Sequence, residues 1–333
     1  MDITIIIVNY CSWGLLENCL QSLQIIKHQD FTFEVIVVDN SLDEKKLNEF
    51  KQQFSNFIFY ANKANTGFSH GNNLGVKKAK GNYYLFLNPD TIISKAALFN
   101  LYNAAKNNND LGVISCQQIN ENGIKQDIRK LFPTIFTHFG ISRALYRLFN
   151  KKQLNKKFST NKEQVFPDWA SGSILLIPKI WFDKVNGWSE DFWLYFEDVD
   201  ICKRIKNLGG KIVILQNTLI THKHGGSSRI NLELKALTKA EVIISNHVYI
   251  NKHFKGIYRS IFHFILMLTI LVEKFLLAIL GTLFFFIPKL KMNVVLFSKL
   301  ITYYLQVFLK GTWISQRAVN FQQIIQPKIL TKS

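Results

Sequence analysis

Acidic residues are almost absent from the last third of this 333-residue chain. Residues 203–333 contain 19 lysines and arginines but only three acidic residues, whereas residues 1–202 contain 22 basic and 20 acidic residues. Nearly all of the net charge of +18 therefore lies in the C-terminal part. An imbalance of this kind predicts a polyanionic partner for that part, either anionic lipid headgroups or nucleic acid.

Cysteine is also scarce: Cys11, Cys19, Cys116 and Cys202 lack the CxxC or other spacing of a metal site. Each has apolar neighbours, which predicts reduced, structural thiols in a cytosolic protein. A secretory signal is not expected, because the N-terminus is acidic and the apolar run 3–8 is too short to form one. We therefore expect any catalytic face to stay in the cytoplasm.

The sequence also lacks both common phosphate-binding fingerprints, the P-loop and the dinucleotide-binding GxGxxG. Residues 65–75 are instead rich in Gly and Asn, and we expect them to form a turn that runs into a helix reaching Ala79. Gly and Asn let the backbone approach a ligand closely, and a helix N-terminus favours phosphate. Taken alone, this stretch is a weak indication of a phosphate site.

The chain does contain a series of short apolar runs that are typical of buried strands. The expected strands cover residues 3–8, 33–38, 57–61, 83–87, 112–116, 173–177 and 211–215. Between them, helices are expected near residues 12–23, 96–105, 181–187 and 198–205, whereas residues 126–166 are expected to form an irregular, basic loop or lid. The alternation predicts an α/β fold that begins with a nucleotide-binding half.

Two aspartates follow expected strands directly. Asn88-Pro89 stops the strand 83–87, because proline cannot extend a β-ladder, and this places Asp90 just beyond its carboxyl end. Asp39 ends the strand 33–38 in the same way. Open α/β sheets bind ligands at this edge, where Asp90 with Asn88 is suited to hold a divalent cation against a diphosphate. An Asx-turn that merely closes the strand is equally compatible with these residues.

A second acidic group, Glu197, Asp198 and Asp200, opens the expected helix 198–205. The helix dipole favours acids there, so simple capping is one interpretation. Three aromatic residues precede the group, however, and carboxylates beside aromatics favour a lined pocket in which a raised pKa suits a general base. Further on, His222 and His224 follow the last expected strand, and either could complete a metal site with Asp90, a combination that suits Mn²⁺.

These motifs occur in an order that resembles the family 2 glycosyltransferases of GT-A fold, and most of all their bacterial rhamnosyltransferase-like branch. The resemblance covers about residues 3–229. Its motifs are Asp39-Asn40-Ser41, Gly71-Asn72-Asn73-Leu74-Gly75, Leu87-Asn88-Pro89-Asp90-Thr91, Trp169-Ala170-Ser171-Gly172, Gly187-Trp188, Tyr195-Phe196-Glu197-Asp198-Val199-Asp200 and His222 to Ser227. It implies an α/β GT-A fold, in which a Rossmann-like nucleotide-binding sheet is part of a mixed central β-sheet.

The resemblance also implies roles for individual residues of an inverting, metal-dependent transferase. Asp198 would be the general base, supported by Glu197, while Asp90 and His222 would bind Mn²⁺ or Mg²⁺. The expected nucleotide-binding residues are Val8, Tyr10, Asp39, Asn65, Gly67, Asn72 and Asn88. The residues expected to line the acceptor and sugar are Trp169, Gly172 and Trp193.

Two departures from the family pattern matter for the charge at the site. Asn88 stands where the family carries the first aspartate of Asp-x-Asp, so one expected metal ligand is neutral. Asn72 stands where many relatives carry a diphosphate-binding arginine. Compensating positive charge would have to come from elsewhere, and the basic stretch Lys151–Lys157 is a candidate.

The C-terminal third contains a long apolar segment, Ile261–Ile287, with Glu273 and Lys274 near its midpoint. Charges at the centre of a membrane helix cost about 2.5–3.5 kcal/mol each. The halves on either side have 12 and 13 residues and are too short to span. With the amphipathic stretch Phe297–Leu309, they predict helices lying on an anionic membrane surface. A transmembrane span and an ordinary core or dimer helix are the alternatives; nucleic acid is not expected, because aromatic and basic residues are not interleaved.

The expected organisation is a GT-A domain over residues 1–230, a helical membrane-associating region over 231–326 and a flexible tail over 327–333. The expected function is hexosyl or rhamnosyl transfer from a UDP- or dTDP-sugar to a lipid-linked glycan or an oligosaccharide in bacterial O-antigen or capsule synthesis. It would take place at the cytoplasmic face of the inner membrane, by a peripheral or monotopic enzyme that is monomeric or homodimeric. A catalytically inactive glycan- or lipid-binding module, or a sugar nucleotidyltransferase, are the alternative functions.

Overall fold

The computed structural model describes residues 1–27, 30–159, 162–223 and 231–325. The chain divides into two compact units. The first, which we call the sheet unit, comprises Met1–Asn65, His70–Ser189 and Asp198–Gly226; the second, the helical unit, comprises Thr66–Ser69, Glu190–Glu197 and Ser227–Ser333. The division thus assigns two short segments of the expected GT-A domain to the helical unit. The expected tail 327–333 lies outside the described residues.

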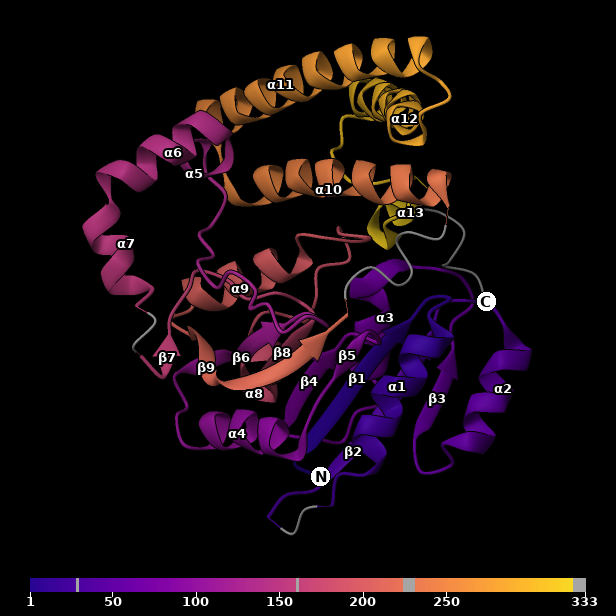
Figure 1. The fold of residues 1–333 in the computed structure, drawn as a ribbon, viewed down its shortest axis with the longest axis vertical. Coiled ribbons are helices and arrows are strands. Elements are labelled where there is room, and N and C mark those ends of the chain that lie inside the picture. The colour runs from indigo at the N-terminus through magenta and orange to yellow at the C-terminus, as the bar shows by residue number, and fades with distance from the viewer. Residues whose placement is uncertain (28–29, 160–161, 224–230, 326–333) are drawn as a thin grey trace. The chain divides into compact units, whose positions relative to one another are not determined.

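Within the described residues, the strands form one mixed sheet of nine, in the order β3-β2-β1-β4-β8-β6-β9-β5, with β7 also paired to β9 (Figure 1). The strands are β1 Ile3–Asn9, β2 Phe33–Asp39, β3 Ile58–Ala61, β4 Tyr83–Leu87, β5 Thr91–Ile92, β6 Leu111–Ile119, β7 Gln164–Val165, β8 Ile174–Pro178 and β9 Lys211–His222. β1 pairs parallel with β2 and β4, whereas β8 runs antiparallel to β4. The mixed α/β sheet that the sequence predicts is confirmed.

Helices cover both faces of this sheet. One face packs against α1 Trp13–Gln24, α2 Glu44–Gln53 and α4 Lys95–Lys106, whose buried apolar side chains join those of β1 and β2 in one core. The other face carries α8 Lys179–Lys184, where Phe182 stacks near Phe86 of β4 at a ring-centroid distance of 5.4 Å. Successive residues of a strand point to opposite faces of the sheet, so the buried side chains of each strand pack against the helices on both faces.

Glycines let helix α3, Gly67–Val76, lie close to strand β1. A Cβ atom on Gly71 would lie 2.9 Å from Val8 Cγ1, and one on Gly75 would lie 2.5 Å from Ile6 Cγ2. The Gly- and Asn-rich stretch is therefore the helix itself, and the prediction of a turn that precedes a helix is wrong. The glycines allow the helix to pack closely against the strand. The number of glycines in a sequence does not distinguish this role from that of a phosphate-binding loop.

The structure corrects two further predictions of secondary structure and one about a cysteine. Residues 126–166 are not irregular, since they contain β7 and the helices α5 Ile135–His138, α6 Gly140–Phe149 and α7 Lys151–Lys157. The last strand does not stop at residue 215; β9 continues to His222 past a register irregularity opposite Cys116 and Gln117. Cys11 is exposed at a left-handed turn with φ of 51°, so the expectation of a buried structural thiol fails there.

The helical unit contains α10 Leu232–His253, α11 Gly256–Leu283, α12 Pro288–Lys310 and α13 Val319–Ile325. Helix α11 is continuous through Glu273 and Lys274, so the expected division into two short halves is wrong. A Cβ on Gly281 would lie 2.3 Å from the carbonyl oxygen of Leu290, which shows how closely α11 and α12 approach. By length and composition, α11 and α12 are the two described helices that could cross a membrane, which is weak evidence for a span.

Candidate active site

Asp39 lies at the carboxyl end of β2, in register with Asn9 at the end of β1. Its Oδ1 accepts hydrogen bonds from Asn9 Nδ2 at 2.8 Å and from Ser41 Oγ at 2.7 Å. Burial raises the pKa of the Asp39 carboxyl, and these hydrogen bonds oppose that shift. Asp39 is thus held as an oriented acceptor beside the two other residues expected to bind the nucleoside, Val8 and Tyr10, which flank Asn9 in the chain and are partly exposed.

The turn after β4 brings Asp90 next to His222. The carbonyl of Asn88 accepts hydrogen bonds from the N–H and hydroxyl of Thr91, at 3.2 and 2.7 Å, which closes the turn. Thr91 then pairs with His222 in the β5–β9 ladder. As a result, Asp90 Oδ1 lies 3.2 Å from His222 Nε2, so the two expected charged metal ligands meet although they are far apart in the sequence.

His222 is oriented by glutamines that the sequence analysis did not single out. Its Nδ1 lies 2.8 Å from Gln118 Oε1, which also accepts a hydrogen bond from Ser173 Oγ at 2.8 Å. The Gln126 amide nitrogen lies 3.2 Å from the same ring nitrogen. The tautomer with its proton on Nδ1 would donate to Gln118 Oε1 and turn the lone pair of Nε2 toward Asp90, whereas the opposite tautomer would accept from Gln126 and donate to Asp90. The signal in the sequence was the polar pair Gln117-Gln118 inside an otherwise apolar strand.

A carboxylate oxygen and an imidazole nitrogen are a suitable donor pair for Mn²⁺ or Mg²⁺ whose remaining positions are taken by diphosphate and water. In the part of the chain that the structure describes, no group of three His, Cys, Asp or Glu residues is arranged to hold a metal ion. Asp90 and His222 therefore fit a metal ion that a bound ligand also coordinates, and not an ion held by protein groups alone. His224, the alternative ligand, lies outside the described residues.

Asp198 lies in the first turn of α9, Glu197–Asn207, and its carboxylate is held from two sides. Oδ2 accepts a hydrogen bond from the backbone N–H of Gly172 at 2.9 Å, and Oδ1 accepts one from the N–H of Val199 at 2.8 Å. Burial raises the pKa of the Asp198 carboxyl, while the hydrogen bond from Gly172 opposes this. A Cβ on residue 172 would lie 3.4 Å from Asp198 Cβ, so Gly172 contacts the carboxylate directly.

Asp200 has a structural role, which separates it from Asp198. It is fully buried and forms an ion pair with Arg204 at 2.7 Å. Arg204 also donates hydrogen bonds to the carbonyls of Val185 and Gly187, at 2.6 and 2.8 Å. The pair ties α9 to the loop after α8. Just before α9, Tyr195 and Phe196 both have left-handed φ angles, 72° and 64°, which are unfavourable for bulky side chains and occur mostly at functional sites.

Trp169 is half-buried, and its indole N–H donates to the carbonyl of Leu131 at 3.1 Å. Lys130 Nζ lies 5.0 Å from the centroid of its ring. The neighbouring Asp168 forms ion pairs with Lys157 at 2.7 Å and Lys206 at 2.8 Å. Burial tends to raise the pKa of Asp168, but these lysines bring it below its usual range. Lys157, one of the basic residues suggested to compensate a diphosphate, is thus already paired with a carboxylate.

Gly67 and Trp193 contact each other within the helical unit. Gly67 has φ of +84°, and a Cβ there would lie 2.1 Å from the Trp193 carbonyl oxygen. Phe68 N–H donates to that carbonyl at 2.8 Å, and Arg317 lies 5.4 Å from the Trp193 ring centroid. Only 4% of the Trp193 surface is exposed. Among the other expected residues, Glu197 and Asn72 are buried and Asn65 and Asn88 are half-buried.

Comparison with known sequences shows the family to which this chain belongs. Residues 4–169 match the profile of glycosyl transferase family 2, and residues 153–225 match the profile described as the N-terminal domain of galactosyltransferase. The rhamnosyltransferase WbbL of Escherichia coli (strain K12) is 28% identical over 217 residues, which cover 62% of this chain and 78% of that protein. This chain is a family 2 glycosyltransferase of the rhamnosyltransferase-like kind.

Two other relatives of this glycosyltransferase are a hexosyltransferase and a beta-glucosyltransferase. The low-salt glycan biosynthesis hexosyltransferase Agl10 of Haloferax volcanii is 29% identical over 212 residues, 62% of each chain. The poly(ribitol-phosphate) beta-glucosyltransferase of Bacillus spizizenii is 32% identical over 137 residues, which cover 39% of this chain and 21% of that protein. The chain therefore spans less than two thirds of both these relatives.

Solved structures show the same fold. The mannosyltransferase PcManGT from Pyrobaculum calidifontis, in complex with GDP-Man and Mn²⁺, aligns with a TM-score of 0.51 at 14% identity, over 93% of this chain and 88% of that one. GalNAc-T7 with UDP, GalNAc and Mn²⁺ aligns with a TM-score of 0.53 at 16% identity, over 73% of this chain and 48% of that one. Identities this low establish the GT-A fold alone.

Proposed function

We propose that this glycosyltransferase transfers a hexosyl or rhamnosyl group, with inversion, from a UDP- or dTDP-sugar to a lipid-linked glycan in bacterial surface polysaccharide synthesis. The observation that carries the proposal is the approach of Asp90 Oδ1 to His222 Nε2, with Nδ1 of the same histidine held by Gln118. The rhamnosyltransferase WbbL, the hexosyltransferase Agl10 and the poly(ribitol-phosphate) beta-glucosyltransferase support the reaction class, and the Mn²⁺ in two structures of this fold supports a divalent metal.

Asp198 supplies the base in this proposal. Its carboxylate takes the proton of the acceptor hydroxyl while that oxygen attacks C1 of the sugar from the face opposite the diphosphate. The bond between C1 and the diphosphate oxygen breaks, and its electrons leave with the nucleoside diphosphate, so the configuration at C1 inverts. The hydrogen bonds from Gly172 and Val199 fix the direction of the carboxylate, and its raised pKa makes it a stronger base.

The other residues bind and orient the donor. Asp39 would accept hydrogen bonds from the nucleoside, while Asp90 and His222 would hold a divalent ion that neutralises the charge developing on the departing diphosphate. With the ion bound, Gln118 would accept a hydrogen bond from Nδ1 of His222 and so hold the ring with Nε2 toward the ion, as partners of metal-binding histidines commonly do. Mn²⁺ or Mg²⁺ would serve here.

We also propose that the helical unit lies on the anionic, cytoplasmic surface of the inner membrane. Helix α11 leaves one apolar face exposed at helical spacing: Ile257, Ile261, Phe264, Leu268, Val272, Phe275, Ile279 and Leu283. The excess of lysine and arginine after residue 202 would attract acidic headgroups. A monotopic arrangement fits this combination; a transmembrane span or a dimer through the same apolar face is the alternative.

Nucleotide binding and donor hydrolysis test the proposal without knowledge of the acceptor. A thermal-shift screen of UDP, dTDP and GDP with Mn²⁺ should show stabilisation by the matching nucleotide alone, since a ligand of the folded state raises the melting temperature. Slow, metal-dependent hydrolysis of the matching sugar nucleotide should follow, and Asp90→Asn should abolish it. A protein that binds no nucleotide and hydrolyses no donor would instead be an inactive binding module.

A further inference from the structure

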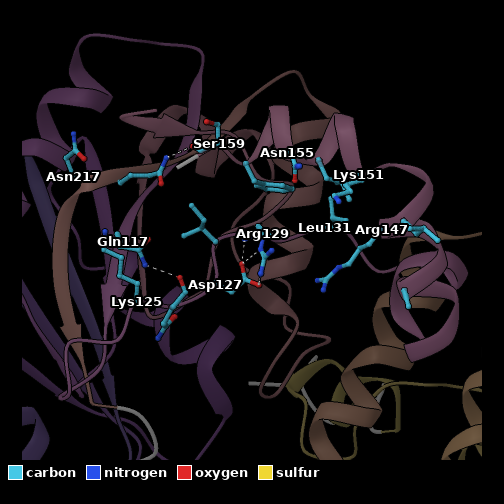
Figure 2. Close-up of a pocket in the computed structure, with 17 residues that line it drawn as sticks. Gln117, Lys125, Asp127, Arg129, Leu131, Arg147, Lys151, Asn155, Ser159 and Asn217 are labelled. Atoms are coloured by element: carbon cyan, nitrogen blue, oxygen red, sulfur yellow. Dashed lines mark hydrogen bonds and ion pairs between the residues drawn. The ribbon is translucent and has the colours of Figure 1, made fainter. Parts of the chain in front are cut away.

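A cavity of about 950 Å³ opens in the sheet unit beside helices α6 and α7 (Figure 2). Its walls come from those helices, from the stretch 125–131 and from Gln216 and Asn217 of strand β9. The volume lies in the range of small-molecule sites. Lys151, which lines it, belongs to the basic stretch suggested to compensate the diphosphate charge; none of the other residues predicted from the sequence to bind the nucleotide or the metal, or to act as base, lines it.

The cavity is strongly basic. Lys125, Arg129, Arg147 and Lys151 line it, with Asp127 as the one carboxylate among the lining residues. Arg129 is paired with Asp127, at 2.9 Å between Nε and Oδ1. The other three cations form no ion pair and no side-chain hydrogen bond with any residue of the described ranges. Figure 2 shows Arg129 and Arg147 extending into the cavity from different walls. Several unpaired cations around one hollow favour a phosphorylated ligand.

The same cavity has an apolar side. Leu131, Leu148, Leu154 and Phe158 line it, and α6 continues this surface outward. On α6, Ile141 is 83% exposed and Phe149 is 81% exposed, so the helix presents apolar side chains with arginines between them. An apolar face flanked by basic residues on one exposed helix is typical of a segment that contacts amphiphilic lipid.

The cavity adjoins the residues of the candidate active site. Gln126 lines it, and the Gln126 amide nitrogen lies 3.2 Å from Nδ1 of His222. Leu131 lines it as well, and the Leu131 carbonyl holds the indole of Trp169, which is expected to contact the acceptor. A molecule bound in the cavity would thus extend from residues around Asp90 and His222 toward the exposed face of α6.

We propose that this cavity binds the diphosphate and the first hydrocarbon units of the lipid-linked acceptor, an inference that rests on the proposed function. Lys125, Arg147 and Lys151 contact the phosphate oxygens, while Leu148, Leu154 and Phe158 contact the hydrocarbon chain. A sugar nucleotide would use the charges but would leave the apolar wall and the exposed face of α6 without a partner. The pairing of cations with hydrocarbon surface therefore favours the acceptor lipid over the donor.

The test uses farnesyl diphosphate as a soluble probe, with inorganic pyrophosphate and farnesol as comparisons, in binding titrations on the full chain. The variant is Arg147→Gln, and its control is Arg143→Gln, which removes an exposed cation of the same helix that does not line the cavity. We expect the cavity variant to bind farnesyl diphosphate about 10- to 100-fold more weakly, and the control to stay within about twofold. Pyrophosphate and farnesol should each bind at least about tenfold more weakly than farnesyl diphosphate, because each lacks one half of the recognition.

UDP affinity with Mn²⁺ and donor hydrolysis are measured on the same samples. Unchanged values in the cavity variant support the proposal and show that the variant is folded. A loss of UDP affinity with unchanged farnesyl diphosphate binding would assign the cavity to the donor. Equal losses in variant and control, or equal binding of pyrophosphate and farnesyl diphosphate, would also overturn the acceptor site. Absence of UDP binding and donor hydrolysis in the unmodified chain would instead refute the proposed function, independently of the probe.

Discussion

The sheet unit buries most of its apolar side chains, whereas the helical unit leaves many of them exposed. In the sheet unit, the apolar residues of β1, β2 and β4 are buried between two layers of helices. In the helical unit, α11 buries only a few residues against α12 and leaves a row of large apolar side chains exposed. The helical unit therefore leaves apolar surface available for a further contact. In most of the sheet unit, the apolar side chains already pack against other parts of the same unit.

Helix α6 is the exception within the sheet unit, because it has no buried residue and exposes a row of apolar ones. It therefore resembles α11 more than it resembles α1 or α4. Large exposed apolar side chains thus occur on α6 in the sheet unit and on both α11 and α12 in the helical unit, and all three helices carry basic residues. Exposed apolar surface on this scale commonly marks contact with a membrane or another protein.

The largest expected effect concerns the charged metal ligand of the sheet unit. Asp90→Asn removes the only carboxylate of the Asn88–Asp90 motif, and we expect loss of both transfer and Mn²⁺-dependent nucleotide binding. Asn88→Asp should keep activity and tighten Mn²⁺ binding. His222→Ala should lower the apparent Mn²⁺ affinity more than His224→Ala. Metal titrations of donor hydrolysis check these changes, and near-normal turnover of Asp90→Asn would remove Asp90 from the site.

The apolar face of α11 is expected to control membrane binding. The triple variant Leu268→Ser, Val272→Ser and Phe275→Ser should lower binding to anionic vesicles by at least about tenfold, since it removes buried hydrocarbon area. Rising salt should weaken binding of the unmodified protein, because exposed charges are screened. Vesicle flotation measures both effects. If the protein stays bound to the vesicles at high salt and only detergent releases it, a transmembrane span would be favoured over the monotopic arrangement.

Gly67 should prove essential to the packing of the helical unit. Gly67→Ala places a Cβ against the Trp193 carbonyl at a positive φ, so we expect a loss of about 1–3 kcal/mol in the free energy of unfolding. Gly14→Ala is the matched control, because a Cβ there meets nothing within 4 Å and the residue lies in helix α1. Urea unfolding of both variants gives the comparison; equal stability would mean that the 66–69 segment can readjust.

The smallest expected effect is a pH dependence in the helical unit. Burial raises the pKa of Glu241, in α10, to about 7, although Ser315 Oγ donates to it at 3.0 Å. The folded state therefore holds this proton more tightly than the unfolded state, and stability should fall as the pH rises from about 4.5 to 7. Glu241→Gln should remove this slope, worth about 1–3 kcal/mol at most. Unfolding free energies at pH 5, 6 and 7.5 test it.

The strands and the strand-end acids were predictable because they depend on local patterns. Continuous apolar runs specify buried strands, and Pro89 fixes where β4 must end, so the position of Asp90 followed. The approach of His222 to Asp90 rests on the β5–β9 pairing, which the sequence does not display because β5 has only two residues. The glutamines that orient His222 were missed for the same reason: Gln118 acquires its role only through tertiary contact.

The helices of residues 126–166 were harder to foresee. Helix α6 has no buried residue, so its apolar residues do not point to a core, and the clustered lysines of α7 obscure helical spacing. Gly71 and Gly75 led to the incorrect prediction of a turn, since glycine-rich segments suggest turns. Here their missing side chains allow a helix to contact β1, and tertiary packing overrides local propensity.

In the proposed function, Asp198 is the base and does not bind the donor. The decisive measurement determines transfer rate and UDP–Mn²⁺ affinity separately for Asp198→Asn, Glu197→Gln and Asp200→Asn. We expect Asp198→Asn to lower turnover by about 10²–10⁴ with unchanged UDP affinity. Glu197→Gln should lower it less, and Asp200→Asn should act mainly on stability through the lost Arg204 pair. A parallel loss of UDP affinity and rate in Asp198→Asn would make Asp198 a donor ligand, and an inactive Glu197→Gln beside an active Asp198→Asn would make Glu197 the base.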